Sequence, residues 1–152
     1  MFQFLKRKNK FFSADDNQHI VEAIQQAEKS TSGEIRVFVE SKCSYMDALD
    51  RAKEIFTKIE MQKTTDRNAV LVYVAVKDRQ LAVFGDEGIH TKVGDEYWNS
   101  QVKLMISHFN KENFAEGIRQ CVLEVGEALT KYFPYNKDTD KNELPDDIVF
   151  GR

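Results

Sequence analysis

The strongest constraint on the fold is a nearly continuous apolar run at residues 69–76, which reads Ala-Val-Leu-Val-Tyr-Val-Ala-Val. β-Branched and aromatic residues of this kind favour strands. A strand that lacks alternation of apolar and polar residues must be covered on both faces. The sequence therefore predicts the central strand of a sheet that has helices on both sides.

The segments around this run supply the other elements. Residues 34–40 alternate apolar and charged side chains, as a strand does, and residues 80–84 return after a short turn as an antiparallel partner. Because a strand-helix-strand crossover is almost always right-handed, the first two strands are expected to be parallel neighbours. Apolar residues at helical spacing predict helices over residues 13–29, 44–59, 95–109 and 114–133.

This order of elements predicts a three-layer α/β/α sandwich around a small, mixed, Rossmann-like sheet. At 152 residues the chain fits one domain that folds on its own core. We expect a basic, aromatic N-terminal arm over residues 1–12, the α/β/α domain over 13–133, and a polar C-terminal tail over 134–152, whose last apolar residues could dock on the domain.

Composition narrows the classes of function. The net charge of −3 carries no field that would attract DNA or RNA, so we expect no nucleic-acid partner. No secretory signal and no run of about 18 apolar residues is present, so a soluble, cytoplasmic protein is expected. Cys43 and Cys121 lack metal-ligand spacing and are interpreted as reduced packing residues.

The N-terminal arm leaves two interpretations open. Phenylalanines alternate with lysines and an arginine over residues 1–12. Such a segment could make a peripheral contact with an anionic membrane or a membrane protein. It could equally pack back on the core through its phenylalanines.

Acidic loops marked by glycines bracket both open ends of the predicted hairpin. A hairpin brings its two ends together, and the parallel first strand starts at the same end of the sheet. Clustered carboxylates suit a hard cation, for which Ca²⁺ is preferred here and Mg²⁺ or Mn²⁺ are alternatives. The candidate metal ligands are Asp66, Asp86, Glu87, Asp95, Glu96 and Glu34.

Each of these acids also has a purely structural interpretation. Asp95 could be a helix N-cap, Glu96 a first-turn partner of the helix dipole, and residues 86–87 a solvated turn. An EF-hand is excluded because its spacing is absent. The three histidines are scattered singly, which argues against zinc, and His90 alone lies near the acidic loops.

A phosphatase would need a metal-activated water and cations for the phosphoryl group. Asp66 and Asp95 could hold such a metal, with Arg67 or Lys92 as phosphate ligands. Motifs for a nucleophilic cysteine with a phosphate loop, a Walker loop and a Ser-His-Asp triad are absent.

Three segments together resemble the TPM-domain family, named for a thylakoid-lumen protein, a photosystem repair factor and an acetylcholine-receptor auxiliary protein. They are Thr31-Ser-Gly-Glu-Ile-Arg-Val37, Asp66-Arg67-Asn68, and Val83-Phe-Gly-Asp-Glu-Gly88 followed by Asp95. The resemblance covers roughly residues 13–133. It implies an α/β/α sandwich, a calcium-binding acidic site in some members, and acid phosphatase activity in a plant member.

Position by position, Asp66, Asp86 and Asp95 match the acids of the family pattern. The family's Asp-Asn-Gly reads Asp-Arg-Asn here, and the signal peptide and anchor of exported members are not seen. We therefore expect a stand-alone, bacterial-type member: a non-enzymatic, calcium-binding module for an unknown protein partner, acting in assembly or maintenance. The alternative is a metal-assisted acid phosphatase acting on phosphomonoesters, so enzymatic activity stays open.

Overall fold

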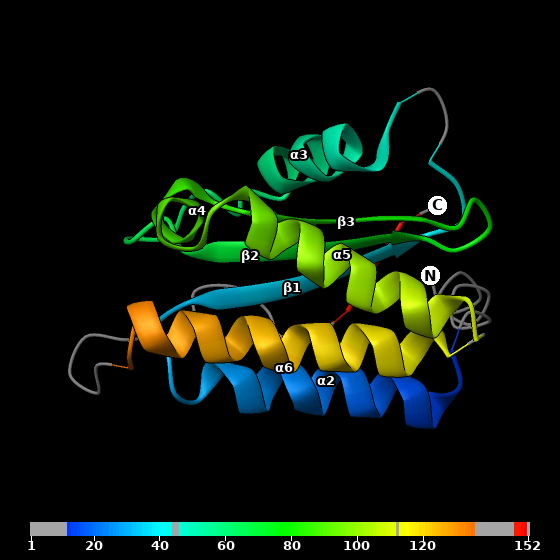
Figure 1. Cartoon of the computed structure of the whole chain (residues 1–152), viewed down its shortest axis with the longest axis horizontal. Helices are drawn as coiled ribbons and strands as arrows, with labels where there is room; N and C mark the ends of the chain where they lie inside the picture. Colours follow the sequence, from blue (N-terminus) through cyan, green and yellow to red (C-terminus); the bar gives the residue numbers. More distant parts are fainter. Residues whose placement is uncertain (1–11, 44–45, 112, 136–147, 152) are drawn as a thin grey trace.

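A computed structural model describes residues 12–43, 46–111, 113–135 and 148–151. Helices lie on both faces of one sheet (Figure 1). The elements are α2 (Ala14–Glu28), β1 (Glu34–Glu40), α3 (Ala48–Lys58), β2 (Ala69–Ala75), β3 (Gln80–Gly85), α4 (Glu87–Val93), α5 (Asp95–Phe109), α6 (Phe114–Tyr132) and β4 (Val149–Phe150).

The sheet has the strand order β3-β2-β1-β4 and is mixed. β1 runs parallel to β2, with Glu34 opposite Ala69, whereas β3 runs antiparallel to β2, with Gly85 opposite Val70. Every residue of β2 is buried. The predicted buried central strand, its parallel neighbour and its antiparallel return are therefore confirmed.

Alternation along β2 divides the core between the two faces of the sheet. Val70, Val72 and Val74 belong to the cluster that α2, α5 and α6 cover. Leu71 and Tyr73 point the opposite way and pack with residues of α3. Successive side chains of a strand point to opposite faces, so a strand buried on both faces requires these two helical layers. The predicted α/β/α sandwich is confirmed.

Two elements differ from the sequence-based prediction. The second helix was predicted from residue 44 but begins at Ala48, because the Asp47 side chain accepts the amide of Asp50 and caps the helix there; residues 44–45 lie outside the described chain. The predicted acidic loop after β3 contains a short helix, α4. Asp86 is its N-cap and Ile89 buries it against the core, which stabilises a helix that sequence periodicity does not reveal.

The structure describes part of each end of the chain. Phe12 is buried in the core, while residues 1–11 of the predicted arm lie outside the described residues, so a membrane contact stays a prediction. At the other end the tail does dock, because Val149 and Phe150 pair with β1 as a parallel strand. Both cysteines are unbridged and buried, as expected. Among the helices of the described residues, none has an apolar stretch of the length that a membrane span requires.

Candidate functional site

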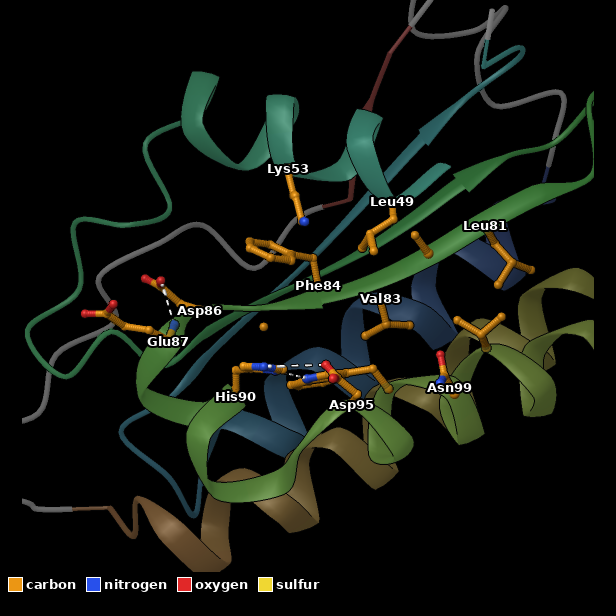
Figure 2. Close-up of a pocket in the computed structure, with 14 residues that line it drawn as sticks. Leu49, Lys53, Leu81, Val83, Phe84, Asp86, Glu87, His90, Asp95 and Asn99 are labelled. Carbon is orange, nitrogen blue, oxygen red and sulfur yellow. Dashed lines mark hydrogen bonds and ion pairs between the residues drawn. The ribbon is translucent and has the colours of Figure 1, made fainter. Parts of the chain in front are cut away.

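A groove of about 760 Å³ runs along β3, between α3 and α5. Figure 2 shows Leu49 and Lys53 of α3 on one side of the strand and Asp95 and Asn99 of α5 on the other. The groove ends at the start of α4. Its lining is Leu49, Lys53, Leu81, Ala82, Val83, Phe84, Gly85, Asp86, Glu87, His90, Asp95, Trp98, Asn99 and Val102.

The position of β3 in the sheet explains why side chains of both faces line the groove. β3 is an edge strand, so its outer margin lies between the two helical layers. Ala82 and Phe84 pack with the α3 cluster, whereas Leu81 and Val83 pack with the α5 cluster. A groove that collects all four must follow the margin of the strand itself.

The end of the groove near α4 is acidic but partly neutralised. The Asp86 carboxylate is buried and accepts two hydrogen bonds from Arg67, from Nε at 2.6 Å and from Nη2 at 2.9 Å. Glu87 Oε1 lies 3.5 Å from Nη1 of the same guanidinium. The hydrogen bond to Asp86 raises the pKa of the Arg67 guanidinium, which keeps this cation charged beside the two acids.

Backbone contacts hold the Asp66–Asn68 loop against the start of α4. The Gly88 amide donates to the Arg67 carbonyl at 2.8 Å, and the Asp86 amide donates to the Ala69 carbonyl at 2.9 Å. Arg67 adopts a left-handed φ of 51°, where the family pattern has Asn. A Cβ on Gly88 would lie only 2.1 Å from the Asp66 carbonyl oxygen, so the two segments touch. The expected meeting of the hairpin ends is therefore present.

The six predicted ligands divide into two groups. Asp86, Glu87 and Asp95 line the groove. Asp66 and Glu96 are exposed outside its lining, and Glu34 is buried at the start of β1. In the part of the chain that the structure describes, no three His, Cys, Asp or Glu side chains gather as a metal-binding group. Calcium binding stays a prediction.

His90 is held by two neighbours on α5. The Trp98 indole Nε1–H donates to His90 Nδ1 at 3.0 Å, and His90 Nε2 lies 3.6 Å from Asp95 Oδ1. An indole nitrogen can only donate, so Nδ1 is the acceptor of this hydrogen bond. The contacts with Trp98 and Asp95 together fix the orientation of the imidazole ring.

Sequence reasoning missed the apolar wall of the groove. Leu49 is one of the apolar residues at helical spacing over residues 44–59, but it is 44% exposed. Trp98 is buried and also lines the groove. The available signal was the pair Leu49 and Lys53, which lie four residues apart on one helix face.

Comparisons with known proteins fit this architecture. A family model described as the TPM domain matches residues 5–128. The solution structure of the BA42 protein from the psychrophilic bacterium Bizionia argentinensis shares 42% identity over 93% of this chain and 96% of that chain, with a TM-score of 0.85. The N-terminal domain of the cg2496 protein from Corynebacterium glutamicum shares the fold at 17% identity, over 78% of this chain and 74% of that one, with a TM-score of 0.63. A search of curated proteins finds no match.

Proposed function

Because this chain belongs to the TPM domain family, we propose that it is a non-enzymatic binding module that recognises a protein partner through the groove along β3. The observation that carries this proposal is the groove itself, in which an apolar floor ends in acidic side chains. Its volume of about 760 Å³ lies in the range of small-ligand and peptide sites. Four elements, α3, β3, α4 and α5, build it, so it follows from the fold as a whole.

The side chains of the groove support recognition better than catalysis. Leu49, 44% exposed at its rim, lies with Phe84 and Val102 in an apolar lining that a ligand can cover. Both ring nitrogens of His90 face a partner, and both oxygens of Asp86 accept from Arg67. His90 and Asp86 are therefore held in place by neighbouring side chains, which suits a fixed recognition surface.

Calcium belongs to this proposal as the cation of the acidic end. The fit is limited, because Asp86 already has Arg67 as its counterion. Glu87 and Asp95 remain as the carboxylates that face the groove. Calcium sites with few charged ligands bind in the millimolar range, and we propose weak binding of this kind.

A calcium titration followed by amide NMR tests the cation. We expect shifts at Glu87 and Asp95 in the millimolar range, and their loss in the double variant Glu87→Ala with Asp95→Ala. Glu127→Ala, which removes an exposed acid of α6, is the matched control. Equal shifts in the double variant and the control would count against a cation at this end of the groove.

A metal-assisted acid phosphatase is the second candidate, because the matching family model carries the name TPM_phosphatase. It predicts hydrolysis of an aryl phosphate that requires added divalent cation and disappears in the same double variant. Activity that persists there would come from another site. Absence of any hydrolysis would leave the binding module as the function.

A further inference from the structure

We propose that the groove binds an extended peptide segment of a partner protein, which adds to the outer margin of β3 as a further strand. This inference rests on the proposed function and deepens it by naming the class of ligand.

The backbone hydrogen bonds of β2 show which of its residues face β3 and which face β1. The Ala69 carbonyl accepts from Asp86 on the β3 side, whereas the Val76 amide, seven residues later, donates to Glu40 on the β1 side. Residues of a strand alternate between its two neighbours. Therefore the odd-numbered residues of β2 pair with β3, and Tyr73 pairs with Ala82 through hydrogen bonds.

The same alternation defines the outer margin of β3. Opposite the odd-numbered residues of β2 lie Gln80, Ala82 and Phe84, whose amide and carbonyl groups form hydrogen bonds with β2. The amide and carbonyl groups of Leu81 and Val83 then point away from the sheet, into the groove. No strand within the described residues pairs with this margin.

The two sides of the sheet differ in whether the described chain supplies a further strand. At the β1 edge the chain adds its own tail, where Val149 and Phe150 form β4 and the Gly151 amide donates to the Val39 carbonyl. Open edges are usually blocked by a charged side chain, a proline or a bulge. Residues 81–85 read Leu-Ala-Val-Phe-Gly and contain no charge and no proline. The β3 edge therefore keeps a row of donors and acceptors that matches one kind of ligand, an extended polypeptide.

The helices on either side give the added strand its side-chain contacts. Successive side chains of a strand point to opposite faces, so a peptide on this edge would direct alternate residues toward α3 and toward α5. Leu49 with Phe84 forms an apolar surface on the α3 side, and Trp98 with Val102 forms one on the α5 side. Alternate apolar residues in the ligand would bury against them.

Charge distinguishes the two ends of the groove. The carboxylates of Asp86, Glu87 and Asp95 lie at its α4 end (Figure 2). The nearby cations are Arg67, which pairs with Asp86 and Glu87, and Lys53, which lies over the Phe84 ring, so the acids outnumber the bases. The complementary ligand has a lysine or arginine at that end. A second copy of this chain fits less well, because its own β3 is flanked by α3 and α5, and these helices would meet their counterparts across the groove.

A phage-displayed library of random nonapeptides, selected on the immobilised full chain, supplies the probe. Enriched peptides should carry alternating apolar residues and a basic residue at one end. Their binding should fall at least tenfold in Leu49→Asp and stay unchanged in Ile106→Asp. Both variants place a charge at a similarly exposed apolar residue, with Leu49 inside the groove and Ile106 outside it.

A scan of single N-methyl groups along an enriched synthetic peptide then tests strand addition itself. Methylation removes one amide donor, so alternate positions should lose about tenfold in affinity and the intervening positions should lose little. A scan without this period of two, in a peptide that still needs Leu49, would overturn strand addition and leave the proposed function standing. Enrichment of no groove-dependent peptide would overturn both. Self-association in sedimentation, abolished by Leu49→Asp, would identify a second copy as the occupant and refute the peptide.

Discussion

Replacing Gly88 by alanine sets two physical effects against each other. Gly88 is the second residue of α4, where alanine is intrinsically favoured over glycine by about 1 kcal/mol. Against this, the new Cβ would lie 2.1 Å from the Asp66 carbonyl oxygen and 2.6 Å from that of Arg67. Both are backbone atoms and cannot rotate away, so the loop must retreat by about 1 Å. Overpacking of this kind costs about 1–3 kcal/mol.

The retreat also stretches the 2.8 Å hydrogen bond from the Gly88 amide to the Arg67 carbonyl, whose loss costs about 1 kcal/mol. We therefore expect Gly88→Ala to be destabilising by about 1–3 kcal/mol, because the lost hydrogen bond offsets the gain in helix propensity and the cost of overpacking remains. For a domain of this size that lowers Tm by about 2–12 °C.

Urea denaturation followed by circular dichroism measures this change, with Lys92→Ala as the control. Lys92 is an exposed residue of the same helix, so its replacement should change stability by less than about 0.5 kcal/mol. A stabilised Gly88→Ala, or two variants of equal stability, would refute the packing of the Asp66–Asn68 loop on α4.

Two further predictions concern the acidic end and the core. Asp86→Ala should lower the free energy of unfolding by more than the roughly 1 kcal/mol of a helix cap, because an ion pair is lost as well. Asp95→Ala should change it by less than about 0.5 kcal/mol, because the Asp95 side chain is 90% exposed. Equal urea midpoints for the two variants would contradict this. Burial raises the pKa of the Cys121 thiol and of the Tyr73 phenol, so the folded state holds these protons longer than the unfolded state. Stability should therefore be complete below about pH 8.5 and fall as the pH rises toward 10 and beyond, less steeply in Cys121→Ala; urea midpoints that rise with pH would have the wrong sign.

The sheet and its helical layers could be predicted from sequence because each depends on local periodicity. The unbroken apolar run of β2 requires cover on both faces, and the alternation in β1 marks a strand at once. α4 could not be found this way. It has seven residues, includes Gly88, and depends on a cap from Asp86 and on burial of Ile89, which only the tertiary structure supplies.

The candidate site was predictable in part. Hairpin geometry correctly brought the Asp66 loop and the Asp86 turn together. The pairing of Arg67 with Asp86 was not foreseen, because it joins two polar residues 19 positions apart in a segment without periodicity. The groove itself depends on which strand lies at the edge and on where α3 and α5 end, and neither follows from spacing along the chain.

Amide hydrogen exchange along β3 tests the account most directly, since recognition is assigned to an uncovered strand margin. In the native protein the amides of Gln80, Ala82 and Phe84 should be protected by β2, while the amide of Leu81, which is partly exposed, should exchange rapidly. An enriched peptide should then slow exchange at Leu81. Uniform protection along β3 in the protein alone would mean that this margin is already covered, and would contradict the account.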